Sequence, residues 1–346
     1  MNYSIIVPVY NRPDEVDELL QSLCQQTVKD FEVIVVEDGS TVTCKDVCDK
    51  YADILHLYYY AKPNSGPGQS RNYGAERAHG EWLIVLDSDV VLPKDYLSAV
   101  DNNLQSSNLK SQTSNLNPQC FGGPDAAHPS FTPVQKAISY SMTSFFTTGG
   151  IRGGSSPLRG DKRGALDKFY PRSYNMGIRR EVYQKLGGFS KMRFGEDIDF
   201  SYRIVEAGYK TALIPDAWVW HKRRTDLKKF FRQVYNSGIA RINLTKRHPG
   251  TLKLVHLLPT VFTVGVIGLL LLSPFCLLAL VPILLYSSII FIDSSIKNRS
   301  LRVGLLSIPA AFTQLMGYGF GFIEAWWKRC VLGKDEFQAF EKNFYK

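Results

Sequence analysis

Residues 82–93 read WLIVLDSDVVLP, an apolar run that is interrupted by Asp87-Ser88-Asp89. The part before the interruption has the length and the aliphatic character of a strand buried on both faces of a parallel sheet. A polar turn that closes the strand is one explanation, because acidic residues are common in turns. A second explanation is a metal site, since two carboxylates this close at a strand end can share a divalent cation. The rest of the sequence decides between them.

Three further apolar runs have the same strand-like character, at residues 3–10, 31–38 and 54–60. Between them, Pro13 and Pro67 each open a segment with helical features, the second running to about His79. Further helices are expected at residues 180–186 and 197–207. Strands that alternate with helices predict an α/β domain with a mostly parallel sheet.

Acidic residues follow two of these strands. Glu37 and Asp38 close the second strand, and Asp87 and Asp89 close the fourth. In open α/β sheets, ligands bind beyond the carboxyl ends of the strands. The placement of both clusters at such ends therefore favours a binding site over two unrelated turns.

The chain has 346 residues, of which 45% are hydrophobic and 21% charged, and its net charge is +9. This composition is typical of a folded protein with room for one large domain and an appendage, or for two domains. The positive charge suits an anionic partner, such as a phosphorylated ligand or an acidic membrane surface. No helix-turn-helix, zinc-finger or ribonucleoprotein pattern occurs, so we predict no nucleic-acid partner. The six cysteines form no CxxC pair, and we expect reduced thiols.

Long loops are expected in the middle of the chain. Residues 105–119 are polar, and residues 149–164 are rich in glycine and arginine. Loops of this length in a compact domain are usually functional or mobile.

The C-terminal third is predicted to enter a membrane. The segment from Leu254 to Ile292 is almost wholly apolar and is broken only at Ser273-Pro274. Each half approaches the roughly 20 residues that cross a bilayer. The stretch Gly304–Ile323 carries five glycines or prolines and Gln314, so it could span the bilayer or lie re-entrant.

Basic residues set the expected orientation. Lys246 and Arg247 precede the apolar hairpin, and Lys297, Arg299 and Arg302 follow it. Basic flanks favour the cytoplasmic side. The N-terminus MNYSIIVPVYN has no basic region before its apolar run, so we expect no signal peptide and a cytoplasmic first domain.

These patterns predict four regions. They are an α/β domain at residues 1–222, a basic amphipathic juxtamembrane segment at 223–253, an all-α transmembrane region at 254–325 and a tail at 326–346.

Two downstream segments carry further candidate site residues. Glu196, Asp197 and Asp199 open a predicted helix, where carboxylates complement the helix dipole. The dipole explains one or two acids, whereas three after a glycine favour a site in which a carboxylate takes a proton from an attacking hydroxyl. His221 ends the aromatic run PDAWVWH, and a metal-ligating and a structural role are about equally favoured.

Five segments in this order resemble the family 2 glycosyltransferases of the GT-A fold. They are VPVYNRPDEVDELLQSLCQQ, VVEDGS, NSGPGQSRNYGAERAHGEWLIVLDSDVVLP, NMGIRREVYQKLGGF and GEDIDFSYRI. The resemblance covers roughly residues 3–222. It implies a GT-A-type, Rossmann-like sheet and transfer of a sugar, with inversion, from a nucleotide-diphosphate donor, a UDP-sugar being favoured. It also implies a Mn²⁺ or Mg²⁺ cofactor.

The resemblance assigns roles to matching positions. Asp87 and Asp89 would hold the metal, with Asp89 the closer, and His221 would be a further ligand. Asp197 would be the general base, beside Glu196 in the catalytic segment.

The remaining positions would bind the donor or the acceptor. The nucleotide pocket would be formed by Pro8, Tyr10, Glu37, Asp38, Arg71, Asp87 and Ser88. Asp38 would contact the base, and Asn175 and Gly177 would lie near the donor sugar or the acceptor.

The sequence departs from the family at one motif. Processive polysaccharide synthases carry Gln-x-x-Arg-Trp after the base, whereas this chain has FFRQVYNSGIAR at residues 230–241. Arg232, Gln233 and Arg241 could bind a diphosphate of donor or acceptor, or equally touch lipid headgroups. We therefore favour single addition over processive synthesis.

The leading hypothesis is a multi-pass glycosyltransferase of the bacterial inner membrane. Its expected partners are a nucleotide-sugar, a lipid-linked or saccharide acceptor, and membrane lipid. An alternative is a degenerate transferase domain that acts as a membrane-bound assembly partner. Nucleotidyl transfer would require a glycine-rich, lysine-bearing loop after the first strand, and VPVYNRPDEV has none.

Overall fold

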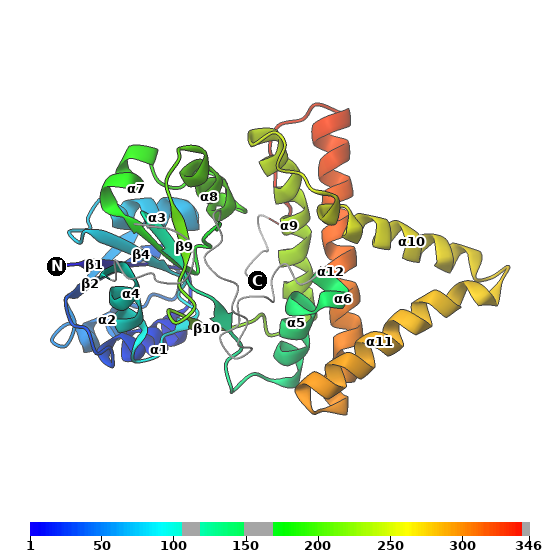
Figure 1. Ribbon diagram of the computed structural model, residues 1–346, viewed down its shortest axis with the longest axis horizontal. Coiled ribbons are helices and arrows are strands. Elements are labelled where there is room, and N and C mark those ends of the chain that lie inside the picture. Colours follow the sequence, from blue (N-terminus) through cyan, green and yellow to red (C-terminus); the bar gives the residue numbers. More distant parts are fainter. Residues whose placement is uncertain (106–117, 149–168, 341–346) are drawn as a thin grey trace. The chain divides into compact units, whose positions relative to one another are not determined.

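The computed structural model describes residues 1–105, 118–148 and 169–340 (Figure 1). Most of the two predicted long loops therefore lies outside the described residues. The chain forms two compact units, which are described separately. The first contains Met1–His128 and Ser155–Lys222, and the second contains Pro129–Gly154 and Arg223–Lys346.

The first unit is built on a seven-stranded sheet of order β3-β2-β1-β4-β8-β6-β9. Its strands are β1 (Tyr3–Val9), β2 (Phe31–Asp38), β3 (Leu57–Lys62), β4 (Trp82–Leu86), β6 (Cys120–Gly122), β8 (Asn175–Arg179) and β9 (Thr211–Leu213). β1 pairs in parallel with β2 and β4, and β2 pairs in parallel with β3. β8 runs antiparallel to β4 and β6. The predicted mostly parallel α/β sheet is thus confirmed.

Helices cover both faces of this sheet (Figure 1). They are α1 (Pro13–Cys24), α2 (Lys45–Tyr51), α3 (Pro67–Ala75), α4 (Tyr96–Gln105), α7 (Arg180–Leu186) and α8 (Glu196–Glu206). Side chains alternate between the faces of a strand. Ile5 accordingly packs in a core with Leu19 of α1, whereas Ile6 packs with Phe200 of α8. This double burial explains why β1, β2 and β4 read as continuous apolar runs.

A small second sheet has the order β5-β10-β7. Its strands are β5 (Val90–Val91), β7 (Asp125–Ala126) and β10 (Val219–His221). β10 pairs antiparallel with β5 and parallel with β7. The sheet therefore holds His221 opposite Val90, next to the Asp-x-Asp pair.

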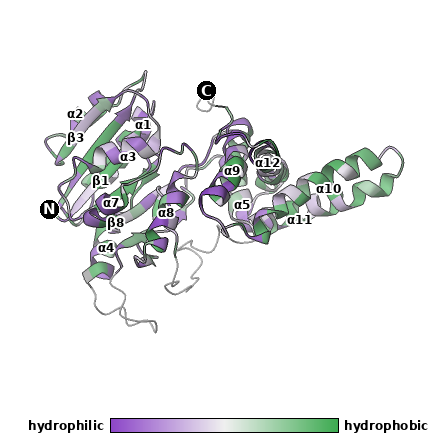
Figure 2. Ribbon diagram, turned by 90° about the horizontal axis from the view of Figure 1, so that it is seen from above, coloured by the Kyte–Doolittle hydropathy of each residue, from purple (hydrophilic) through white to green (hydrophobic). Residues whose placement is uncertain are grey.

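The second unit is helical. It contains α5 (Pro133–Thr143), α6 (Phe145–Thr148), α9 (Leu227–Arg247), α10 (Leu258–Leu272), α11 (Val281–Asn298) and α12 (Leu301–Trp326). Short turns of other helix types are η2 (Leu254–His256), η3 (Leu277–Leu280) and η4 (Trp327–Val331). Figures 1 and 2 both show α10 and α11 as a hairpin that extends away from α12.

Glycines allow α12 to approach its neighbours closely. A Cβ on Gly321 would lie 2.0 Å from the carbonyl oxygen of Tyr235 on α9. A Cβ on Gly319 would lie 2.1 Å from Oγ1 of Thr263 on α10. The glycines that left the topology of this stretch open in the sequence are therefore packing positions of one continuous helix.

The two compact units differ at one place from the domain boundaries expected from the sequence. Residues 129–148 were expected within the 1–222 domain, but they belong to the second unit. The physical reason is the apolar face of α5, where Ala137 and Ile138 pack in one cluster with Phe230 of α9 and Val303 of α12.

Three helical segments are long and apolar enough to cross a membrane: Leu254–Leu272, Leu277–Asn298 and Leu301–Val331. Only 11% and 17% of the first two windows are buried, against 50% of the third. Figure 2 shows hydrophobic residues along the whole hairpin of α10 and α11. Such large exposed apolar surface indicates association with a membrane.

Candidate active site

The strongest cluster of potential metal ligands lies at the end of β4. Asp87, Asp89 and His221 each offer one ligand atom, and these atoms all lie within 4.8 Å of one another. Nε2 of His221 is 3.2 Å from Oδ1 of Asp89. Two carboxylates and one imidazole, all partly accessible, are a donor set that suits Mn²⁺ and also admits Mg²⁺. The residues present thus fit the expected ion.

Two further side chains, those of Asp125 and Tyr174, lie beside the imidazole of His221. Its Nδ1 lies 3.7 Å from Oδ2 of Asp125 on β7, and its ring stacks on Tyr174 at a centroid distance of 5.1 Å. The distance to Asp125 exceeds that of a hydrogen bond, so Asp125 acts on His221 through charge and proximity, in the position from which a carboxylate orients a metal-binding histidine. Sequence reasoning missed Asp125, because only the pairing of β7 with β10 brings it there.

Arg12 is a second residue that sequence reasoning missed. It lies in the connection from β1 to α1, and its Nη1 is 2.6 Å from Oδ2 of Asp89. The guanidinium therefore places positive charge at the metal cluster. This charge would also stabilise a diphosphate bound there.

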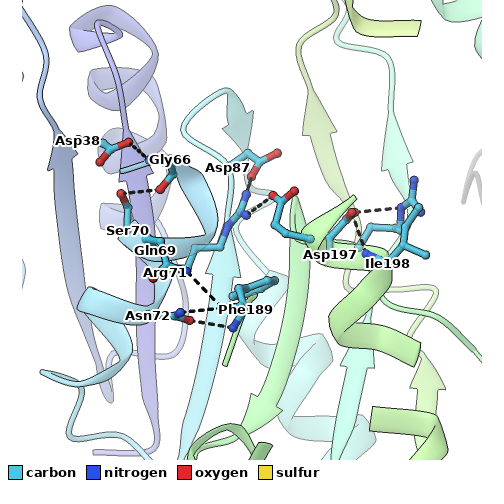
Figure 3. A network of polar contacts seen from close by, with 12 residues as sticks. Asp38, Gly66, Gln69, Ser70, Arg71, Asn72, Asp87, Phe189, Asp197 and Ile198 are labelled. Carbon is cyan, nitrogen blue, oxygen red and sulfur yellow. Dashed lines mark hydrogen bonds and ion pairs between the residues drawn. The ribbon is translucent and has the colours of Figure 1, made fainter. Parts of the chain in front are cut away.

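Arg71 joins the metal cluster to α8, as Figure 3 shows. Its Nη2 is 2.8 Å from Oδ1 of Asp87, and its Nη1 is 2.8 Å from Oε1 of Glu196. The side chain is only 4% exposed and lies over the ring of Phe189. In the structure, the guanidinium of Arg71 pairs with the buried Glu196 and with the partly exposed Asp87, and its predicted contact with the nucleotide stays a prediction.

Glu196 is the most strongly perturbed acid of the site. Burial raises the pKa of Glu196 to about 7, although the neighbouring Arg71 acts in the opposite direction. A carboxyl group so deeply buried is stabilised in its neutral form. Its bond to Arg71 makes Glu196 an anchor of α8 and not a freely accessible base.

Asp197 is more accessible than Glu196, with 17% of its side chain exposed. Its Oδ1 accepts a hydrogen bond from the Ile198 amide at 2.9 Å, and its Oδ2 lies 3.2 Å from Nε of Arg172 (Figure 3). Both contacts orient the carboxylate at the start of α8. Arg172 was not anticipated from the sequence.

Asp38 and Glu37 differ in their surroundings because adjacent strand residues face opposite sides of the sheet. Asp38 accepts hydrogen bonds from the amides of Ser65 and Gly66, both at 2.9 Å, and pairs with Lys62. It therefore shapes the loop that leads into α3.

Glu37 turns into the interior instead. It is 1% exposed and accepts hydrogen bonds from the Cys44 amide at 2.8 Å and the Tyr59 hydroxyl at 3.3 Å. Its oxygens thus bind neighbouring groups of the protein, and its predicted place in the nucleotide pocket stays a prediction.

The other predicted nucleotide residues lie at strand ends of the same sheet. Pro8 and Tyr10 are half-buried at the end of β1, and Ser88 is buried between the two aspartates.

Asn175 and Gly177 are both packed inside the sheet. Oδ1 of Asn175 accepts from the Tyr96 hydroxyl at 2.6 Å, and its Nδ2 donates to the Ala217 carbonyl at 2.8 Å. A Cβ on Gly177 would lie 2.1 Å from the ring of Phe121. These contacts give both residues a packing role, and their predicted contact with sugar or acceptor stays a prediction.

Arg232, Gln233 and Arg241 lie on α9 in the second unit. Oε1 of Gln233 accepts from Nε of Arg224 at 3.3 Å, and Arg232 lies over the ring of Phe340. These contacts are all internal to that unit.

The sheet and the acidic cluster at its strand ends define a GT-A-type transferase fold. Mannosyltransferase PcManGT from Pyrobaculum calidifontis, solved in complex with GDP-Man and Mn²⁺, shares this fold with a TM-score of 0.59 and 18% identity, over 91% of this chain and 87% of that one. TarS 1-349 of S. aureus in complex with UDP-GlcNAc gives a TM-score of 0.50 and 16% identity, over 96% and 93%.

Sequence comparisons define the family. The family model Glycosyl transferase family 2 matches residues 4–111, and Glycosyl transferase family group 2 matches residues 172–292. An uncharacterized glycosyltransferase of Haemophilus influenzae is 30% identical over 209 residues, which are 59% of this chain and 62% of that protein. The chain therefore carries family 2 glycosyltransferase domains, as the sequence motifs predicted.

The chain covers only part of its curated relatives. It spans 15% of the length of a glycosyltransferase of Rickettsia felis and 14% of glycosyltransferase GlyA of Streptococcus pneumoniae.

Proposed function

We propose that this chain transfers a sugar from a UDP-sugar to a hydroxyl group of a lipid-linked or saccharide acceptor, with inversion and one sugar per encounter. The observation that carries the proposal is the convergence of Asp87, Asp89 and His221 at the carboxyl ends of the parallel strands. The two structural neighbours were solved in complex with GDP-Man and UDP-GlcNAc, which supports the donor class. UDP is favoured because Asp38 corresponds to the family position that contacts the base.

Four side chains prepare the donor site. Asp87, Asp89 and His221 would hold Mn²⁺ or Mg²⁺, which when bound would neutralise the charge on the leaving diphosphate. Asp125 keeps the far nitrogen of His221 oriented, so that Nε2 faces Asp89.

Asp197 is the proposed general base. It has an accessible carboxylate that two neighbours orient, and it would take the proton from the acceptor hydroxyl as that oxygen attacks the sugar. A single displacement of this kind inverts the anomeric centre. Glu196 holds α8 in place through Arg71, which also contacts Asp87.

The test of this assignment is Asp197→Asn. We expect the variant to lose transfer by at least about 100-fold, the range of general-base catalysis, while it still binds UDP with Mn²⁺. Glu206→Gln, which removes an exposed acid from the other end of α8, is the matched control. Full transfer by Asp197→Asn would remove Asp197 from the base role.

We further propose that the second unit inserts into the bacterial inner membrane with the first unit in the cytoplasm. The exposed apolar surfaces of α10 and α11 support two crossings, and basic residues flank both ends of the hairpin. α12 is half buried and lies against both helices, with Gly304 beside Ser295 near the end of α11 and Gly319 beside Pro259 near the start of α10. Both ends of α12 therefore belong on the cytoplasmic side.

A further inference from the structure

The second unit contains a cavity of about 430 Å³. Its walls come from the end of α9, the start of α10 and the end of α12 with η4. Most of the wall is apolar, formed by Ile242, Leu252, Leu257, Phe322, Ile323 and Trp326. This volume and lining are typical of a site for an organic ligand.

The polar groups at this cavity are few, and some have no partner. Thr260 lines the cavity, and among the described residues its buried hydroxyl has no hydrogen-bond partner. Lys246 also lines the cavity and donates to the backbone carbonyl of Arg329. Buried polar groups are nearly always paired, so an unpaired one points to a missing partner.

The cations beside the cavity differ in how they are neutralised. Arg247 pairs with Glu336, and Lys328 pairs with Glu324. In the part of the chain that the structure describes, no carboxylate pairs with Lys246 or with Arg329. Nε of Arg329 is itself buried and has no partner among these residues. Lys246 lines the cavity, and Arg329 directly precedes the lining residue Cys330 and donates from Nη1 to the Lys334 carbonyl at 2.9 Å, so an external anion at this wall would complement the charge of both cations.

The residues that line the cavity indicate at which level of the membrane it lies. Leu257 and Thr260 lie at the first turn of an apolar segment long enough to cross a membrane, and Trp326 ends α12 with its side chain 49% exposed. Tryptophan and basic residues concentrate where hydrocarbon meets the headgroups. Basic pockets between membrane helices at this level bind anionic lipid headgroups.

We propose that this cavity binds a hydrocarbon chain of an anionic membrane phospholipid, whose phosphate contacts Lys246 and Arg329. The apolar wall takes the chain, and Thr260 donates its hydroxyl hydrogen to an ester oxygen of the lipid. The inference rests on the proposed membrane insertion and is independent of the sugar-transfer chemistry.

The test uses the full chain in neutral detergent and the fluorescence of Trp326. Phosphatidylglycerol or phosphatidylcholine with brominated chains is titrated in, because bromine quenches a tryptophan that it touches. The quenching due to Trp326 is obtained as the difference between the parent protein and the Trp326→Phe variant. We expect phosphatidylglycerol to quench at a several-fold lower mole fraction than phosphatidylcholine.

Substitutions test which residues produce the preference for phosphatidylglycerol. We expect Lys246→Gln combined with Arg329→Gln to abolish the preference for phosphatidylglycerol, and Lys246→Arg to retain it. Lys228→Gln removes an exposed charge from the start of α9 and should leave the preference intact. Thr260→Phe, which places a phenyl ring in the cavity, should remove the saturable quenching by both lipids.

Equal quenching by the two lipids in the parent protein would overturn the proposal. So would a preference that survives in the double variant. Nucleotide-induced stabilisation is measured on the same samples. Lipid preference without any nucleotide response would contradict the transferase proposal alone, and the reverse result would contradict the lipid site alone.

Discussion

Glu196 gives the site a pH dependence with a definite sign. Burial raises the pKa of this carboxyl group to about 7 from its ordinary value of 4.5, so the folded protein keeps a proton that the unfolded chain releases. The folded state binds more protons between these values, and stability falls as pH rises through this window. We expect Glu196→Gln to lose this part of the pH dependence, because its amide is neutral at every pH. Melting temperatures at pH 5 and pH 8 provide the measurement.

The exposed acid Glu206 is the control for that comparison. Glu206→Gln removes a carboxylate from the same helix and should keep the parent's fall in melting temperature between pH 5 and pH 8. If the melting temperature of Glu196→Gln falls by the same amount as that of the parent, the buried carboxyl group is not the source of the pH dependence.

Asp125 should affect metal affinity without being a ligand. Because it faces the far nitrogen of His221, Asp125→Asn should weaken Mn²⁺ binding by about 10-fold, the lower end of the usual effect of such residues. The affinity is read from the Mn²⁺ concentration that stabilises the UDP complex. Asp216→Asn, at an exposed position, should change nothing. An unchanged Mn²⁺ affinity in Asp125→Asn would contradict the orienting role.

At the scale of single residues, the sequence predicts which residue types lie at the strand ends. It does not predict which residues contact them in the fold. Asp87, Asp89 and His221 were expected to meet, and the structure brings them together. Arg12 and Arg172 could not be found, since their partners lie 77 and 25 residues away in the chain, and only the tertiary fold joins them. Such pairing has no local sequence signal.

At the scale of the element, glycines decide how α9 packs on α12. A Cβ on Gly238 of α9 would lie 2.2 Å from the carbonyl oxygen of Tyr318, which is too close for any side chain. We expect Gly238→Ala to destabilise the second unit by about 1–3 kcal/mol, as overpacking of a close contact does. Thermal unfolding in detergent measures the change.

Gly265 is the matched control for this substitution. It also lies in a membrane-unit helix, but a Cβ there would meet nothing within 4 Å. Gly265→Ala should therefore be neutral, or stabilising by up to about 1 kcal/mol through helix propensity. Equal effects of the two alanines would show that α9 and α12 do not pack this closely.

Long buried elements were predictable and short ones were not. β2, β4 and α7 have the bounds that their apolar runs and turn residues indicate. β3 starts at Leu57 and not at Ile54, because Ile54 and Leu55 belong to the turn after α2. β7 has two residues, and two residues carry no periodicity that a sequence could reveal.

At the scale of the whole molecule, the proposed topology places two exposed cysteines on opposite sides of the membrane. Cys276 lies at the tip of the hairpin between α10 and α11, and Cys330 follows α12. We expect a membrane-impermeant maleimide to label Cys276 from the outer face of intact cells and Cys330 only after permeabilisation. Cys276→Ser and Cys330→Ser identify each labelled site.

Labelling of Cys330 from the outer face would show that α12 crosses the membrane. Labelling of neither cysteine before permeabilisation would show that the hairpin does not reach the outer face. Either result contradicts the two-crossing arrangement.

The division into an α/β part and an apolar part was visible in the sequence, because the long apolar runs come after residue 253. The membership of α5 in the second unit was not visible. Its apolar face resembles that of any amphipathic helix, and only its packing against Phe230 and Val303 decides where it belongs.

The most direct test of the central claim is nucleotide- and metal-dependent stabilisation of the full chain. A ligand that binds only the folded state raises the melting temperature in proportion to its affinity and concentration. We predict that UDP with Mn²⁺ raises it more than either alone and more than GDP with Mn²⁺, and that Asp89→Asn loses the increase. No response to any nucleoside diphosphate or nucleotide-sugar with Mn²⁺ would contradict the account.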